Sequence, residues 1–178
     1  MAEQPVSESV DHSIRELLRA CERSAVHLEM RDGYMRSDPM FIAWQTGGRE
    51  DPVVRDTFRS WTQLVREITG RGVDVRRARI VSEPISDYVR FEYEISDSNV
   101  AAGERVRWLP RRRATDLALP GNDFWLLDER LVIVIHFTGE GELGGRETTT
   151  DPAVVKLCAS AFEAVWERAI PHEDYRPT

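Results

Sequence analysis

The chain has 178 residues, a length that fits one domain with its own hydrophobic core. Its formal net charge of −7 and isoelectric point near 5.2 argue against a general affinity for nucleic acid or anionic membranes. No apolar run approaches the roughly 20 residues of a membrane span, and the first residues lack a signal-peptide pattern, so we expect a cytoplasmic protein that contacts neither membrane nor nucleic acid directly.

The N-terminal third predicts helices around one strand. We expect residues 1–12 to be disordered, and residues 8–23 contain the i, i+3, i+4, i+7 apolar spacing of an amphipathic helix. Residues 25–31 alternate apolar and polar side chains as a half-buried strand does. A short helix is predicted over 37–48 and a longer amphipathic one over 54–69, with a flexible loop, "REDP", between them.

Two further strands are predicted at 73–84 and 105–110, each ending at a proline. Between them, residues 86–96 alternate as a strand does but also fit a helix capped by Ser86 or Asp87. We favour the helix, because a segment between two strands suits a crossover connection.

The most apolar segment is "DFWLLDERLVIVIHF", residues 123–137, which predicts a tight hairpin turning at residues 128–130. Its second strand is a continuous β-branched run, typical of the centre of a sheet. After a glycine-rich loop at 139–145, we expect an edge strand from residue 146 and a final helix at 151–169, capped by Asp151.

These elements predict the α/β class, with a mixed β-sheet flanked by helices in a single domain over residues 1–178. Residues 171–178 are expected to form a C-terminal tail. Cys21 and Cys158 occupy apolar positions of predicted helices, so we expect buried thiols without a disulfide.

His136 is the sharpest enzymatic candidate, since a phospholipase-D-type motif reads H-x-K-x-x-x-x-D. Here Thr138 and Leu143 occupy the lysine and aspartate positions, and the chain has one lysine, Lys156, on a separate helix. We therefore interpret His136 as a strand-end histidine bonded to a neighbouring carbonyl or carboxylate, and predict no catalytic residue.

Acidic residues offer a second candidate. Asp123, Asp128 and Glu129 would suit paired carboxylates or a metal, but turn chemistry alone explains Asp128 and Glu129. No histidine stands in ligand spacing, so we predict neither a metal nor a cofactor. An alternative is an anion-binding face made by arginines of two strands and a loop: Arg76, Arg77, Arg79, Arg105, Arg107, Arg111, Arg112 and Arg113.

Four segments, "RIVSEPISDYVRFEY", "AAGERVRWLPR", "LALPGNDFWLLDERLVIVIHF" and "DPAVVKLCASAFEAVWERAIPHEDYRP", carry a resemblance over residues 15–177. The chain resembles an uncharacterised actinobacterial family often encoded beside helix-turn-helix transcription regulators. It is more loosely similar to non-catalytic phospholipase-D-like sensor domains of bacterial regulators. This likeness implies a phospholipase-D-like half-domain with the hairpin 123–137 at the middle of the sheet, and pairing of two copies as a homodimer.

We therefore expect a non-enzymatic regulatory or ligand-sensing domain that acts with a helix-turn-helix DNA-binding partner, which the resemblance supplies. The alternative is a degenerate or unrecognised phospholipase-D-like phosphoryl-transfer enzyme using His136, Asp123 and the arginines. A small anionic ligand or a partner segment would bind at strand ends and loops. The candidate residues are Glu83, Asp87, Arg90, Arg107, Arg111, Asn122, Asp123, Trp125 and His136.

A competing interpretation is that these residues satisfy one another. In that case Arg90 or Arg107 would pair with Glu83 or Asp123 and hold the loops in place.

Overall fold

The computed structural model describes residues 14–47 and 52–178, and the strands within them form one mixed sheet in the order β6-β5-β4-β1-β2-β3-β7. The strands are β1 (Ser24–Glu29), β2 (Asp74–Val81), β3 (Arg105–Pro110), β4 (Asp123–Leu127), β5 (Leu131–Phe137), β6 (Leu143–Thr149) and β7 (Ile170–Pro171). The predicted disordered segment 1–12 and residues 49–51 of the predicted flexible loop lie outside the described residues.

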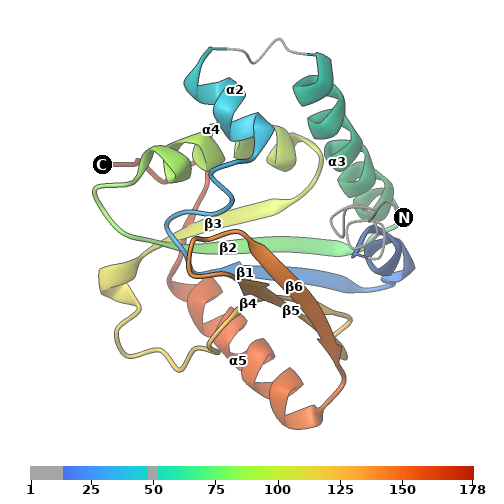
Figure 1. Cartoon of the computed structure of the whole chain (residues 1–178). Coiled ribbons are helices and arrows are strands. Elements are labelled where there is room, and N and C mark those ends of the chain that lie inside the picture. The colour runs from blue at the N-terminus through green and yellow to red at the C-terminus, as the bar shows by residue number, and fades with distance from the viewer. Residues whose placement is uncertain (1–13, 48–51) are drawn as a thin grey trace, which may run out of the picture.

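Helices cover both faces of this sheet (Figure 1). Residues 14–20 are helical, and the other helices are α2 (Pro39–Gln45), α3 (Pro52–Gly70), α4 (Asp87–Ala101), α5 (Pro152–Arg168) and the 3-10 turn η1 (Arg111–Arg113). Helices α2, α3 and α4 lie on one side and α5 on the other. The predicted class, a mixed sheet flanked by helices, is confirmed.

The connections explain which helices share a face. Strands β1, β2 and β3 are parallel and adjacent in that order, so right-handed crossovers place α2, α3 and α4 on the same side. Strands β4, β5 and β6 are antiparallel, and α5 follows them onto the opposite face. The sheet is therefore covered on both sides along its centre.

Residues 86–96, which also fitted a strand, belong to helix α4. The Ser86 side chain accepts a hydrogen bond from the Val89 N–H at 3.2 Å, as an N-cap residue does, and Asp87 stands in the first turn. Its buried side chains, Tyr88, Val89 and Phe91 among them, face the sheet and α2. The helix interpretation is confirmed.

The hairpin 123–137 turns where expected, but its place in the sheet was predicted wrongly. Asp128 and Glu129 have φ angles of 52° and 55°, which suit the tight turn between β4 and β5. Strand β1 is central, whereas β5 is second from the β6 edge. The continuous apolar run of β5 arises because both its faces are covered, Val132 packing on one side and Ile133 with Ile135 on the other.

Strand β6 is the predicted edge strand, and it begins earlier than expected. Leu143, Gly144 and Gly145, assigned to the glycine-rich loop, belong to β6, and Leu143 and Gly145 pair with β5. A register irregularity between His136 and Phe137 accommodates them. The connecting loop is correspondingly shorter.

The first helix ends at residue 20 and not at 23, because Asp128 holds the next backbone groups. Its carboxylate accepts hydrogen bonds from the N–H groups of Glu22, Arg23 and Ser24 at 3.1, 2.7 and 3.0 Å, and from the Cys21 thiol at 3.1 Å. Burial, the largest cause, raises the pKa of Asp128, but together these hydrogen bonds outweigh it and lower the pKa to about 2. The hairpin tip is thereby fixed to the start of β1.

We expect Asp128→Asn to lower the free energy of unfolding by about 1–2 kcal/mol at pH 7, because the amide offers fewer acceptor sites to the same donors. Asparagine tolerates the positive φ, so the change isolates the hydrogen bonds. Urea denaturation measures the loss. Glu129→Gln, at the exposed neighbouring position, is the control and should change stability by less than about 0.5 kcal/mol; equal effects of the two would contradict the anchoring role.

The residues expected to form a C-terminal tail pack against the sheet. Strand β7 pairs with β3, and the buried ring of Tyr175 stacks on Trp108 at a centroid distance of 5.6 Å. His172 is also buried, and its Nδ1 accepts a hydrogen bond from the Trp108 indole at 3.0 Å. The chain end thus completes the far side of the sheet.

Both cysteines, Cys21 and Cys158, are free thiols and buried, as predicted. Burial is the largest cause that raises the pKa of each thiol, which reaches about 11. Among the described residues, none of the helices has the length and apolar character needed to span a bilayer.

Candidate functional site

The sheet face beneath α2, α3 and α4 carries charged and polar side chains at its centre. His27 and Glu29 of β1 and Arg77 and Arg79 of β2 point to this face. Their neighbours in each strand, such as Leu28, pack toward α5 instead. A row of ionisable groups is therefore enclosed between sheet and helices.

These groups form an ion-pair network. The Arg77 guanidinium contacts Glu104 at 2.6 Å and Glu29 at 2.7 Å, while Arg79 contacts Glu29 and, at 2.5 Å, Glu92 of α4. Glu104 is only 1% exposed. Burial lowers the pKa of Arg77, but the negative charges of Glu104 and Glu29 outweigh it and raise the pKa above its usual value.

His27 lies flat against Trp125 of β4, with ring centroids 4.2 Å apart and planes 17° apart. Its Nδ1 is 3.3 Å from a Glu29 oxygen, and its Nε2 has no hydrogen-bond partner among the residues that the structure describes. Burial, followed by the positive charges of Arg77 and Arg79, lowers the pKa of His27 well below its usual value. The imidazole is therefore neutral at pH 7.

Asp123 stands at the start of β4 beside the end of β1. It accepts a hydrogen bond from the Tyr34 hydroxyl and another, at 3.0 Å, from the Met30 N–H. Burial raises the pKa of Asp123 to about 6, although both hydrogen bonds oppose the rise. Burial likewise raises the pKa of Tyr34 well above its usual value.

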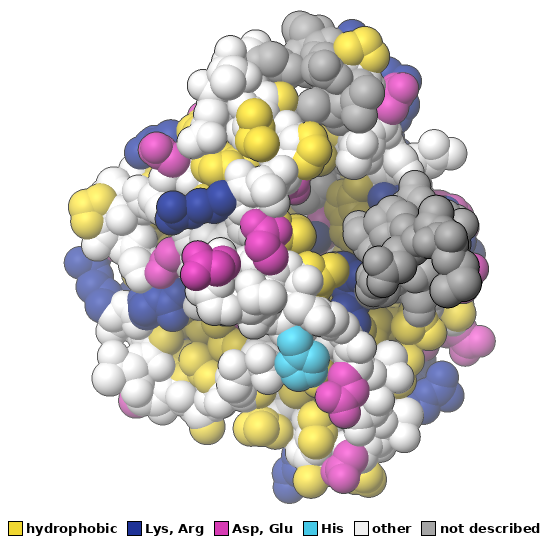
Figure 2. Space-filling model, viewed as in Figure 1, with side chains coloured by type: hydrophobic (Ala, Val, Ile, Leu, Met, Phe, Trp, Pro, Cys, Tyr) yellow, Lys and Arg dark blue, Asp and Glu magenta, His cyan; other side chains and the backbone are white. Residues whose placement is uncertain are grey.

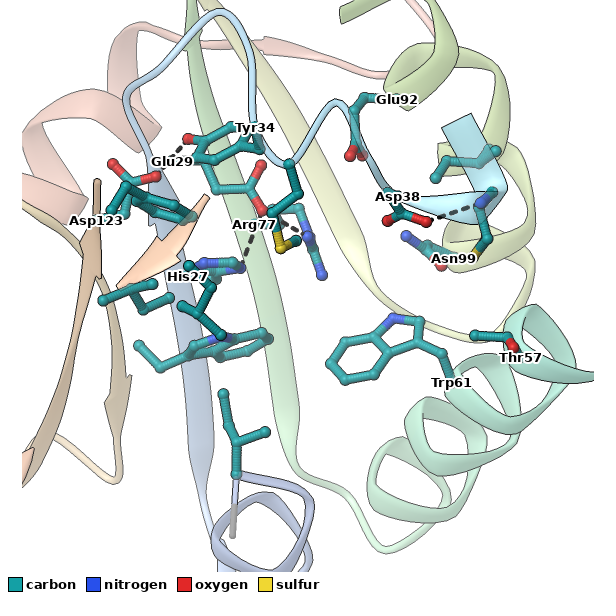
Figure 3. A pocket seen from close by; sticks show the side chains of 18 of the residues that line it. His27, Glu29, Tyr34, Asp38, Thr57, Trp61, Arg77, Glu92, Asn99 and Asp123 are labelled. Carbon is teal, nitrogen blue, oxygen red and sulfur yellow. Dashed lines mark hydrogen bonds and ion pairs between the residues drawn. The ribbon is translucent and has the colours of Figure 1, made fainter. Parts of the chain in front are cut away.

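A pocket of about 320 Å³ opens over this network. Figure 3 shows His27, Arg77 and Asp123 on the sheet side and Trp61, Asn99 and Glu92 on the helix side, around one space. On the surface, hydrophobic, acidic and basic side chains are interspersed over the face viewed in Figure 2. Asn99 is 3% exposed, and its Oδ1 has no hydrogen-bond partner within residues 14–47 and 52–178.

Of the residues predicted from sequence, Asp123 and Trp125 line this pocket together. Glu83 and Arg111 line a second recess of about 300 Å³ at the ends of β2 and β3. Asp87, Arg90 and Asn122 are exposed and line neither pocket.

The predicted pairing of Arg90 or Arg107 with Glu83 or Asp123 is wrong, because Arg107, Glu83 and Asp123 each have other partners. Arg107 donates to the Trp166 carbonyl at 2.9 Å and lies 4.4 Å from the ring centroid of that residue. Glu83 accepts a hydrogen bond from the Tyr175 hydroxyl at 3.0 Å and lies 3.4 Å from Arg112. Strand alternation directs Arg107 to α5, away from Asp123.

Arg111 joins the ends of three chain segments. Its guanidinium donates to the carbonyl oxygens of Met30 and Ile80 at 2.6 and 3.1 Å and to the Ser82 hydroxyl at 2.9 Å. These bonds use Nε and Nη2, and Nη2 also lies 3.3 Å from a carboxylate oxygen of Asp32, so Arg111 already has an internal anion. The other arginines of the proposed anion-binding face divide between the two sides of the sheet, Arg76 toward α5 and Arg77 toward α3, so that face does not form.

His136 contacts a carboxylate, as the sequence interpretation expected. Its Nε2 lies 3.4 Å from Glu147 of β6, and its side chain is 44% exposed. Because Ile135 pairs with Asp123 and lines the pocket, the next residue, His136, points to the opposite face. The phosphoryl-transfer constellation of His136 with Asp123 is therefore not assembled.

Most residues of the pocket were not predicted from the sequence, among them His27, Glu29, Tyr34, Trp61, Glu92 and Asn99. The sequence did contain a signal for these residues. In β1 and β2, which are parallel and central strands, charged residues alternate with apolar ones. Among described residues, no group of three or more histidines, cysteines and carboxylates has the geometry to hold a metal ion.

Known structures resemble this fold at low sequence identity. Nuc from Salmonella typhimurium, described as a phospholipase D family member, matches with a TM-score of 0.56 and 12% identity, over 97% of this chain and 94% of that chain. NucT from Helicobacter pylori matches with a TM-score of 0.51 and 10% identity, over 92% of this chain and 91% of that chain. At these identities the likeness shows a phospholipase-D-like fold alone, as the sequence resemblance implied.

Among curated proteins, none matches the chain significantly in sequence. A family model does match, over residues 12–177, nearly the whole chain. The chain belongs to the family described as domain of unknown function DUF6879.

Proposed function

We propose that this protein is a non-enzymatic, cytoplasmic ligand-sensing domain whose small-molecule ligand occupies the pocket between the sheet and helices α2, α3 and α4. The observation that carries the proposal is the pair of buried polar groups, His27 Nε2 and Asn99 Oδ1, which line the pocket without a hydrogen-bond partner among the described residues. Buried polar atoms are nearly always paired, so unpaired ones at a concave site favour a bound molecule as their partner.

Phosphoryl transfer is the weaker alternative. His136 and Asp123 point to opposite faces of the sheet, and Lys156 is exposed on α5. The fold shared with phospholipase-D-like proteins does not supply the missing groups, since a fold hosts many functions.

The test is retention of a compound from the small-molecule fraction of native cell extract, identified by mass spectrometry after the protein is washed and denatured. We expect the wild-type chain to retain a compound that Thr57→Trp does not, because residue 57 is exposed at the pocket and an indole there blocks access. Gln63→Trp, an exposed position on the same helix that does not line the pocket, is the matched control and should retain it. Retention of nothing by the wild type, or equal retention by both variants, would contradict the proposal.

The same proposal includes a helix-turn-helix regulator as the partner of this protein and a homodimer as its oligomeric state. Sequence resemblance supports both. The net charge of −7 makes direct DNA binding by this chain the weaker alternative. Co-purification from the native cell tests the partner, and light scattering tests the dimer; a 20.4 kDa species at micromolar concentration would exclude it.

A further inference from the structure

The charges around the pocket are nearly balanced. Its lining includes three arginines and four acids: Arg15, Arg77, Arg146, Glu29, Asp38, Glu92 and Asp123. Glu29 contacts both Arg77 and Arg79, Glu92 contacts Arg79, and Asp123 accepts from Tyr34. A charged ligand that bound to Arg77, Glu29, Glu92 or Asp123 would have to displace one of these internal partners, so at these residues the electrostatics favour an uncharged molecule.

Two neutral groups offer a ligand hydrogen bonds at separate points of the pocket. His27 offers Nε2 from the sheet, and Asn99 offers its amide from α4, on the other side of the space (Figure 3). A neutral imidazole nitrogen and an amide between them donate and accept. A complementary molecule therefore carries both donor and acceptor atoms at its edge.

The remaining walls are aromatic. Trp61 and Trp125 stand with ring centroids 6.2 Å apart and planes at 60°, and Tyr88 and Phe137 also line the pocket. His27 already covers one face of Trp125, but aromatic walls of this kind pack well against planar rings. The volume of about 320 Å³ is near the lower end of the range for small-molecule sites, which suits one or two fused rings.

We propose that the pocket binds an uncharged, planar heteroaromatic molecule of one or two rings, hydrogen-bonded at its edge to His27 and Asn99 and packed against the aromatic walls. This proposal rests on the ligand-sensing function above and names the chemical class of its ligand. Any such ligand has a flat ring system, hydrogen-bond donors and acceptors at its edge, and no formal charge.

The test uses three matched pairs of probes that differ chiefly in charge, each an amide and its carboxylate: nicotinamide and nicotinate, pyrazinamide and pyrazinoate, indole-3-acetamide and indole-3-acetate. Binding is followed by the indole N–H resonances of the tryptophans and quantified by calorimetry. We expect at least one uncharged member to bind with a Kd below about 1 mM, and its charged counterpart to bind at least tenfold more weakly.

Variants locate the contacts. His27→Phe keeps a ring against Trp125 and removes the nitrogens, and Asn99→Leu keeps the volume and removes the amide; each should weaken binding at least tenfold. Asn122→Leu, the loss of an exposed amide outside the pocket, should leave binding unchanged. Thr57→Trp keeps the test decisive if a buried variant fails to fold, because it changes an exposed position and should abolish binding.

The outcomes separate the two proposals. A charged probe that binds more tightly than its neutral counterpart, and is blocked by Thr57→Trp, overturns the ligand class and leaves ligand sensing intact. Binding of none of the six probes also overturns the class, while retention of a compound from cell extract decides the function separately. Neutral-probe binding that Thr57→Trp, His27→Phe and Asn99→Leu all leave unchanged would place the probe site elsewhere and overturn the ligand class. The ligand-sensing function is overturned as well if Thr57→Trp also retains the compound from cell extract.

Discussion

Replacing Arg77 by methionine should lower the free energy of unfolding by about 3–5 kcal/mol at pH 7, because it leaves Glu104 buried without its cation and Glu29 with Arg79 alone. Glu104 is 1% exposed, so water cannot take the place of the guanidinium. Methionine keeps much of the side-chain volume, which limits the contribution of a cavity. Chemical denaturation monitored by circular dichroism measures the loss.

Arg105→Met is the matched control. Arg105 forms an ion pair with Asp74 at 2.5 Å, but its side chain is 58% exposed, and solvent-exposed pairs contribute only about 0–1 kcal/mol. A second test is Arg77→Met combined with Glu104→Leu, which removes the stranded charge and should recover part of the loss. Equal losses from Arg77→Met and Arg105→Met, with no recovery in the double variant, would show that the buried network does not stabilise the fold.

The segmentation of the chain was predictable because local periodicity reports which face of an element is buried. Strand β3 and helix α5 follow their predicted bounds closely, since proline and a capping aspartate mark their ends. Strand order was not predictable in the same way. Hydrophobic β5 was assigned to the centre, but β1, with His27 and Glu29 in its sequence, occupies it.

The same two residues explain why the site was missed. In an isolated strand, His27 and Glu29 alternating with Val26 and Leu28 indicate one solvent-exposed face. Strand β1 has neighbours on both sides and helices over both faces, so the polar face became an interior. Only the paired alternation in β2, which supplies Arg77 opposite, indicates that these charges neutralise one another.

The structure brings together only some of the candidate residues that the sequence placed at strand ends. Asp123 and Trp125 line the pocket, because β4 runs antiparallel to β1 and begins where β1 ends. Helix α4 supplies Glu92 and Asn99 to the pocket. Sequence periodicity indicates which face of a helix these residues occupy, but it does not indicate which strand that face packs against. The site therefore depends on contacts between distant segments, which periodicity does not predict.

Asp123 should make stability fall as pH rises from about 4 to 7. Its pKa is about 6 in the folded protein and 3.8 in the reference state, so the folded chain holds a proton that the unfolded chain has released. The stabilisation is complete below pH 3.8 and is lost as pH passes 6. A difference of about two pKa units corresponds to about 2–3 kcal/mol.

The Asp123→Asn variant isolates this effect, because the amide stays uncharged and still accepts from Tyr34 or the Met30 N–H. We expect the variant to match the wild type near pH 4 and to exceed its free energy of unfolding by about 2–3 kcal/mol at pH 7, measured by urea denaturation across this range. The lowered pKa of Asp128, about 2, acts with the opposite sign and chiefly below pH 4, so it leaves this window clear. A difference between the two proteins that stays constant from pH 4 to 7 would mean that Asp123 is charged throughout, with the Tyr34 and Met30 hydrogen bonds outweighing burial.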